Sequence, residues 1–181
     1  MRTPPSIKQI NELYKSRLFT VQSLDLEFSN GNKVVFERIK ANANKAVMVA
    51  AVTDNKEIIL VREFAAGTER YELQLPKGIV EPGEHSLEAA NRELAEETGY
   101  SAKNLELMHT LRMSPGYFKH ETVLVLATDL EERWLDTGDE PERLEVVKHP
   151  LSDIDSLLLQ EDFSESRSIA GLLLVMRELR L

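Results

Sequence analysis

The 181-residue sequence contains no cysteine and only four histidines. Disulfides, thiol nucleophiles and cysteine-ligated zinc are therefore excluded, and histidine-based metal sites have few candidates. The longest apolar runs cover residues 46–52 and 169–176, which is well short of the roughly 18 residues of a transmembrane helix. The first residues also lack the apolar stretch of a signal peptide. These absences predict a soluble, cytoplasmic protein without a membrane partner.

Basic residues are scarce as well, with 22 Lys and Arg against 31 Asp and Glu and a formal net charge of −9. This balance argues against a nucleic-acid partner, because phosphate backbones are bound by basic faces. The acidity is local: six acidic residues and one basic residue lie between Gly78 and Gly99, and eight and two between Asp129 and Glu145. A phosphate-containing ligand would need a locally basic pocket or metal ions at these segments.

Strands mixed with a few helices, without regular βαβ alternation, predict an α/β protein whose mixed sheet packs between helices. Alternating residues and an Asn30-Gly31 turn predict an antiparallel hairpin within residues 20–38. Gly99 is expected to end the first helix, and Ser152 with Asp155 to cap the second. Further strands are predicted at 46–52, 58–64, 71–75, 105–111 and 122–127, helices at 86–98, 152–159 and 166–181, a break over 76–83 and an acidic connection over 129–145.

The helix predicted over 86–98 carries Glu93, Glu96 and Glu97 on one side, near its C-terminal end. Like charges at this spacing cost a helix about 0.2–0.5 kcal/mol per pair, and a helix C-terminus favours cations instead. Carboxylate clusters of this kind bind hard cations such as Mg²⁺, together with water and phosphate. The alternative is a solvated helix face on which Arg92 pairs with Glu88 and Glu96.

The spacing around this helix resembles the Nudix box. Gly78, five residues, Glu84, seven residues, and then Arg92-Glu93-Leu94-Ala95-Glu96-Glu97-Thr98-Gly99-Tyr100 meet every fixed position of that pattern. The resemblance implies a Nudix hydrolase with an α/β/α sandwich fold that depends on Mg²⁺, with Mn²⁺ as a possible substitute. It implies Glu93 and Glu97 as the main metal ligands, with the Lys77 backbone carbonyl beside them. Glu96 would be a third ligand with a catalytic role, Arg92 would orient the glutamates, and Glu84 would support the loop.

Three features outside the box resemble the ADP-ribose pyrophosphatase branch of the family: the hairpin, Pro115 sixteen residues after Gly99, and the acidic stretch 139–146. Segments 16–21 and 25–31 are similar to the ADP compounds hydrolases. The branch implies an N-terminal dimerisation arm, residues 1–43, before a hydrolase domain, residues 44–181. It also implies Glu140 as the general base and Glu142 as a metal ligand, or the reverse. The reaction would be hydrolysis of ADP linked to another moiety, such as ADP-ribose, NADH or diadenosine polyphosphates, releasing AMP.

Arg38, Arg17 and Lys77 are the candidate cations for substrate phosphate. Tyr117 and Phe118, which follow Pro115, are the candidates for stacking on adenine, with ordinary packing as the alternative. The chain departs from the branch at Glu63-Phe64-Ala65, where an arginine is usual, and at Lys77, where alanine is usual. Two alternatives stay open. One is a Nudix hydrolase of nucleoside triphosphates or capped RNA, and the other is a binding domain for ADP-ribose without catalysis.

Overall fold

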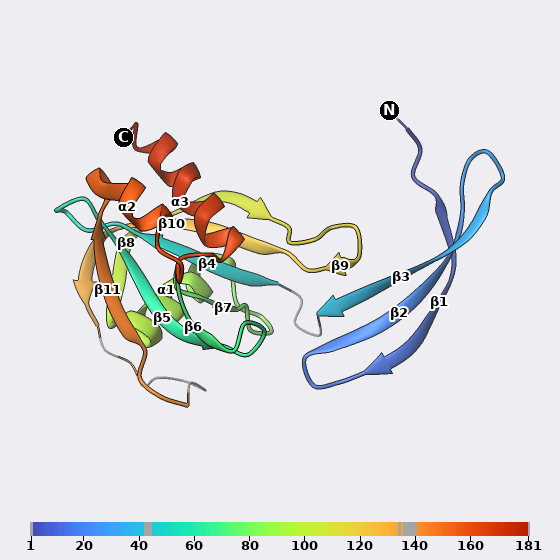
Figure 1. Ribbon diagram of the computed structural model, residues 1–181, viewed down its shortest axis with the longest axis horizontal. Helices are drawn as coiled ribbons and strands as arrows, with labels where there is room; N and C mark the ends of the chain where they lie inside the picture. The colour runs from blue at the N-terminus through green and yellow to red at the C-terminus, as the bar shows by residue number, and fades with distance from the viewer. Residues whose placement is uncertain (1, 42–44, 134, 136–140, 181) are drawn as a thin grey trace. The chain divides into compact units, whose positions relative to one another are not determined.

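The computed structural model describes residues 2–41, 45–133, 135 and 141–180 (Figure 1). The chain forms two compact units, Met1–Asn44 with Arg112–Glu121, and Lys45–Leu111 with Thr122–Leu181. The domain boundary between residues 43 and 44 stays a prediction, and the contacts group segment 112–121 with the N-terminal residues. Among the described residues, each helix is too short or too polar to cross a membrane.

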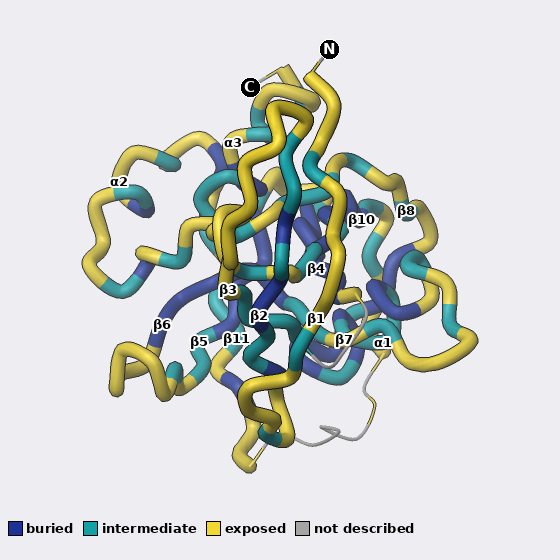
Figure 2. Tube along the Cα trace, turned by 90° about the vertical axis from the view of Figure 1, so that its right-hand side faces the viewer, coloured by how far each residue is buried: buried dark blue, intermediate teal, exposed yellow. Residues whose placement is uncertain are grey.

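The first unit is a four-stranded sheet in the order β1-β2-β3-β9, with bounds β1 Ser6–Lys15, β2 Phe19–Glu27, β3 Lys33–Ala41 and β9 Phe118–Lys119. The predicted hairpin is confirmed, because β2 and β3 pair antiparallel from Glu27↔Lys33 onward. Strands β1 and β9 were not predicted. Nearly all of β1 is exposed (yellow in Figure 2), so its sequence lacks the alternation that marks a half-buried strand, and its pairing with β2 makes it a strand.

The second unit contains two sheets. The mixed sheet runs β7-β4-β10-β8, and the antiparallel sheet runs β11-β5-β6. The bounds are β4 Ala46–Ala51, β5 Glu57–Ala65, β6 Arg70–Gln74, β7 Lys77–Ile79, β8 Tyr100–Leu111, β10 Thr122–Glu132 and β11 Glu145–Pro150. The break expected over 76–83 is wrong at β7, because Lys77, Gly78 and Ile79 pair with β4. The acidic connection is likewise wrong over 129–132, which belongs to β10 and mostly pairs with β8.

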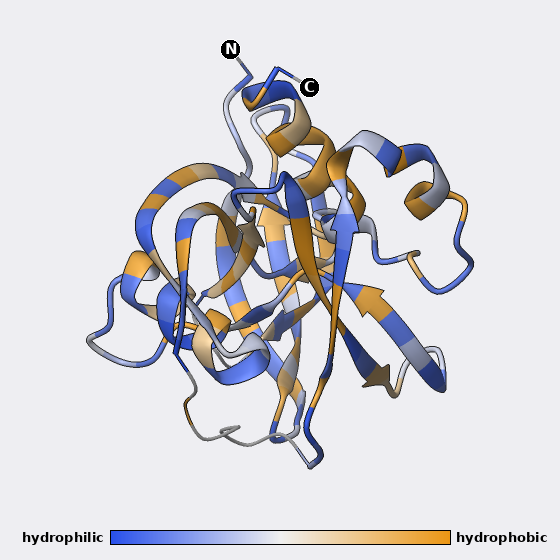
Figure 3. Ribbon diagram, turned by 90° about the vertical axis from the view of Figure 1, so that its left-hand side faces the viewer, coloured by the Kyte–Doolittle hydropathy of each residue, from blue (hydrophilic) through white to orange (hydrophobic). Residues whose placement is uncertain are grey.

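Strand β4 is the centre of this unit and is buried throughout. Because side chains alternate between the faces of a strand, Met48 and Ala50 pack in a core with α2 (Ile154–Leu158) and α3 (Ser166–Glu178). Val47 and Val49 pack with α1 (Ser86–Thr98) on the opposite face. Figure 3 shows orange, hydrophobic bands alternating with blue, hydrophilic ones along the strands. The predicted α/β class, with a mixed sheet between helices, is therefore confirmed.

Two helix ends were predicted from the sequence, and the structure confirms one of them. Helix α1 ends at Gly99 as predicted, because this residue adopts a left-handed conformation (φ 75°) that glycine allows without strain. The cap expected at Ser152 is wrong. Leu151–Asp153 form a 3₁₀ turn, and α2 begins only at Ile154. Leu151 and Leu157 are both fully buried, and this packing sets the start of the segment rather than a side-chain cap.

Candidate active site

Strand β7 brings Gly78 directly against helix α1. A Cβ atom at Gly78 would lie 2.0 Å from Glu93 Cδ and 2.1 Å from each Glu93 carboxylate oxygen. No side chain fits there while Glu93 keeps its position, since real carbon contacts lie near 3.5–4.0 Å. The absence of a side chain at residue 78 therefore lets the backbone of β7 approach the carboxylate directly.

Arg92 joins the first and last parts of the box. Its Nε donates to Glu84 Oε1 (3.0 Å) and one Nη donates to Glu84 Oε2 (3.1 Å), which is a bidentate pair. The other Nη donates to Glu93 Oε1 and Glu96 Oε2, each at 2.9 Å. The hydrogen bonds with Glu84 raise the pKa of Arg92 and lower the pKa of Glu84, so both groups stay charged.

The helix-face alternative is wrong in one of its two pairs. The pair between Arg92 and Glu96 is present, whereas Glu88 accepts a hydrogen bond from the backbone N–H of His85 at 2.9 Å and so helps to start α1. Glu84 also accepts from the backbone N–H of Glu81. Glu88 therefore caps the start of α1, and Glu84 joins the loop between β7 and α1 to Arg92 on the helix.

Glu97 is a buried carboxylate on the same helix. The backbone N–H of Lys77 donates to its Oε2 at 3.2 Å. Burial raises the pKa of Glu97 to about 8, and the charges of Glu93 and Glu63 act in the same direction while Lys77 opposes them. Burial raises the pKa of Glu93 too. Two carboxylates that resist ionisation side by side form a site that a cation would stabilise.

These residues suit a hard divalent cation by their chemistry. Carboxylate and backbone carbonyl oxygens are the ligands that Mg²⁺ and Mn²⁺ prefer, and Gly78 brings the backbone of β7 against the Glu93 carboxylate. Among the described residues no three His, Asp or Glu side chains stand in a ready metal-binding arrangement. The Arg92 guanidinium instead bridges Glu93 and Glu96. Glu93 and Glu97, with the Lys77 carbonyl nearby on β7, are the residues that could hold the ion.

The acidic loop is anchored where it enters β11. Glu140 lies outside the described residues, while Glu142 Oε1 accepts a hydrogen bond from the Tyr71 hydroxyl at 2.6 Å. Arg62 Nε donates to Glu145 Oε2 at 3.0 Å. Tyr71 was not predicted as a site residue, and only the contact across the fold identifies it. Glu63, which contacts Lys77, was also not predicted. Its one signal in the sequence was that Glu63-Phe64-Ala65 stands where the ADP-ribose pyrophosphatase branch usually has an arginine.

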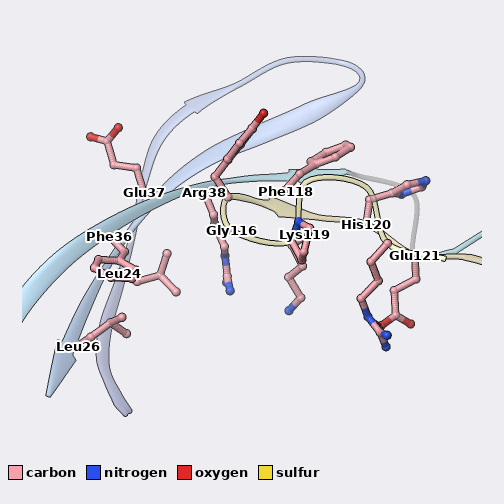
Figure 4. A pocket seen from close by; sticks show the side chains of 13 residues that line it. Leu24, Leu26, Phe36, Glu37, Arg38, Gly116, Phe118, Lys119, His120 and Glu121 are labelled. Carbon is pink, nitrogen blue, oxygen red and sulfur yellow. Dashed lines mark hydrogen bonds and ion pairs between the residues drawn. The ribbon is translucent and has the colours of Figure 1, made fainter. Parts of the chain in front are cut away.

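Three of the predicted substrate residues, Arg38, Pro115 and Tyr117, line one pocket in the first unit, with a volume of about 290 Å³ (Figure 4). They meet because the N–H of Ile39 donates to the Tyr117 carbonyl at 2.7 Å and β9 pairs in parallel with β3. Arg17 lies in the turn between β1 and β2 and is not among the described residues that line the pocket. Lys77 belongs to the second unit. Further lining residues are Leu24, Leu26, Phe36, Arg112 and Lys119.

Comparison with known proteins assigns the family. The NUDIX domain matches residues 43–171, and the NudE-type Nudix hydrolase N-terminal domain matches residues 5–38. The chain is 46% identical to the ADP compounds hydrolase NudE of Escherichia coli (strain K12), over 94% of this chain and 91% of that protein. It is 33% identical to the ADP-ribose pyrophosphatase of Bacillus subtilis (strain 168), over 87% and 84% of the two proteins. A solved structure described as a crystal structure of ADP compounds hydrolase superimposes with a TM-score of 0.91 at 45% identity, covering 99% of this chain and 96% of that one. The chain therefore belongs to the Nudix hydrolase family.

Proposed function

We propose that the protein hydrolyses the pyrophosphate bond of ADP linked to another moiety, such as ADP-ribose, NADH or a diadenosine polyphosphate, and releases AMP. The placement of Gly78 against Glu93, with Glu97 buried beside them, carries the hydrolase assignment. The ADP moiety is supported by the 46% identity to an ADP compounds hydrolase over nearly the whole chain.

Nudix hydrolases generally depend on divalent metal ions, and we propose Mg²⁺, replaceable by Mn²⁺, for this chain. Glu93 and Glu97 would hold it, with Glu96 and the Lys77 backbone carbonyl completing the set. When bound, such an ion neutralises pyrophosphate charge and lowers the pKa of a coordinated water. Arg92, anchored by Glu84, would keep Glu93 and Glu96 in place, since it contacts both carboxylates.

A general base is assigned to the acidic loop. Glu140 is the proposed base and Glu142 the proposed additional ligand, with the roles interchangeable. The hydrogen bond from Tyr71 supports a defined position for Glu142. A base must come within hydrogen-bond reach of the attacking water, so comparison of Glu140→Gln and Glu142→Gln separates the roles. Loss of rate at all metal concentrations indicates the base, and rescue by added metal indicates the ligand.

The pocket of the first unit is the proposed contact for the nucleotide. Tyr117 is 58% exposed and offers a ring face for adenine, and Arg38, held by Gln22 Oε1 at 2.9 Å, offers a cation for phosphate. Pro115 lines the same pocket. Lys77 in the second unit is a further phosphate-binding cation. Arg17 is proposed on its charge alone.

A homodimer formed through the N-terminal sheet is also proposed. Ile7, Ile10, Leu13 and Tyr14 of β1 are each about half exposed, and apolar groups gathered on one strand favour association. Light scattering should find a dimer for the wild type and a monomer for Ile10→Asp. Leu159→Asp, at an exposed residue of the second unit, is the control and should stay dimeric. A monomeric wild type contradicts the proposal. The cytoplasmic location stays a prediction from the sequence.

The activity is tested by chromatography of products. Purified protein with Mg²⁺ should release AMP from ADP-ribose, NADH and diadenosine triphosphate, and Glu97→Gln should lose this activity while remaining folded. Faster cleavage of ATP or of capped RNA would replace the proposed substrate class. Binding of ADP-ribose without release of AMP would indicate the non-catalytic alternative.

A further inference from the structure

Lys77 places a positive charge at the edge of the carboxylate cluster. Its Nζ lies 2.7 Å from Glu63 Oε2, and the two side chains are only 21% and 27% exposed. Gln74 Nε2 donates to the same Glu63 oxygen. Glu63 and Gln74 come from the neighbouring strands β5 and β6, in diagonal positions of the ladder, since Glu63 pairs with Glu72 and Val61 with Gln74. The lysine head group is thus held by the antiparallel sheet.

The main chain of the same lysine contacts the proposed metal ligand. Lys77 N–H donates to Glu97 Oε2 at 3.2 Å, so the residue is fixed to Glu97 at its backbone and to Glu63 at its tip. Both side chains act on Glu97 electrostatically: besides the effect of burial, the charge of Lys77 lowers the pKa of Glu97 and that of Glu63 raises it. The ammonium hydrogen-bonds to Glu63, while the backbone of the same residue is bonded to Glu97.

A stabilising role alone does not explain a carboxylate at residue 63. It adds a negative charge to a site that already contains Glu93 and Glu97, and like charges at close range oppose one another. A glutamine there would accept the same hydrogen bonds from Lys77 and Gln74 through its amide oxygen. Partly buried ion pairs also contribute little net stability. The charge of Glu63 therefore acts on the position of Lys77.

We propose that Glu63 is a positioning residue that holds the Lys77 ammonium away from Glu97 and so keeps Glu97 free to bind the divalent cation. The lysine side chain is a flexible four-carbon stem with a compact charge. Without Glu63, its tip would pair with Glu97, to which its own backbone is already bonded, and would compete with the metal. The inference rests on the proposed role of Glu97 as a metal ligand.

The test measures Mn²⁺ binding by the loss of the free-ion EPR signal, on the full chain without substrate. Glu63→Gln should weaken Mn²⁺ binding about threefold to tenfold, as expected for side chains in one ion-pair network. Lys77→Met should bind at least as tightly as the wild type. The double variant should match Lys77→Met, because no ammonium is left to compete. Glu63→Asp should retain most of the wild-type affinity, and Glu106→Gln, an exposed charge on β8, controls for net charge.

Three results would overturn the inference. Equal weakening by Glu63→Gln with and without Lys77 would show that Glu63 acts directly, and no weakening at all would show that it does not act. A Glu63→Gln protein without a cooperative thermal transition also overturns it, because Glu63 is then a structural residue. Glu97→Gln separates this inference from the proposed function. If Glu97→Gln binds Mn²⁺ as tightly as the wild type, the metal assignment itself fails. If Glu97→Gln loses Mn²⁺ affinity but Glu63→Gln does not, only the inference about Glu63 fails.

Discussion

Substitution of Gly78 by alanine is the most direct perturbation of the proposed site. The new Cβ would lie 2.0 Å from Glu93 Cδ, and because a carbon contact needs about 3.5 Å, the carboxylate must retreat by about 1.5 Å. The atoms that clash are the far end of a flexible side chain, so the fold absorbs the change. We expect the free energy of unfolding to change by less than about 1 kcal/mol. A displacement of this size at a reacting group costs about 100-fold in rate.

The assay combines urea unfolding, Mn²⁺ binding by EPR and AMP release from ADP-ribose. Gly78→Ala should keep its unfolding midpoint while losing metal affinity and at least about 100-fold in kcat/KM. Gly67→Ala is the matched control, because no atom lies within 4 Å of the Cβ it would add, and it should behave as the wild type in all three measurements. Near-normal metal affinity and rate in Gly78→Ala would refute the assignment of Glu93 to the site.

Three other contacts give independent predictions. Tyr71→Phe removes the hydrogen bond to Glu142, which is a loss of about 1.5 kcal/mol. It should lower kcat about tenfold without changing the melting temperature, and an unchanged kcat would remove Glu142 from the mechanism. Asn91 bonds both the N–H and the carbonyl of Ala102, so Asn91→Ala should cost about 1–3 kcal/mol in urea unfolding, and a loss below the error of the measurement would contradict this. Burial opposes ionisation of Glu165, but Arg167 and the backbone N–H groups at the start of α3 lower its pKa overall from 4.5. The contribution of the Glu165 carboxylate to the free energy of unfolding is therefore complete above pH 4.5 and is lost as the pH falls through the lowered pKa of the folded state. The difference in stability between wild type and Glu165→Gln should shrink over that acidic range. A constant difference would show that the charge of Glu165 does not stabilise the protein.

Local signals in the sequence were reliable where the structure depends on neighbouring residues. The hairpin of β2 and β3 and the end of α1 at Gly99 follow from turn and cap residues whose conformations are set within a few positions. The central strand β4 was visible because it is buried on both faces and so appears as a continuous apolar run.

The signals failed where contact with another segment decides the structure. β1 is exposed, lacks a regular apolar alternation and becomes a strand only through β2. β7 forms across a stretch of proline and glycine because β4 offers an edge to pair with. The start of α2 depends on the burial of Leu151 rather than on a cap at Ser152. In each case the element depends on a partner outside its own residues, so the pattern within the segment does not record it.

By itself, the sequence determined that Glu93, Glu96 and Glu97 would lie on one side of a helix beside Arg92, because the 3.6-residue turn brings residues three and four positions apart together. It also determined that acidic charge would gather around that helix. The pair between Arg92 and Glu96 follows from that spacing. The tertiary structure decided the partners beyond the helix: Arg92 pairs with Glu84 across the loop, and Lys77 pairs with Glu63 on another sheet. The physical reason is that a charge interacts with whatever lies within a few ångströms, and only the packing of the sheets and helices sets those distances.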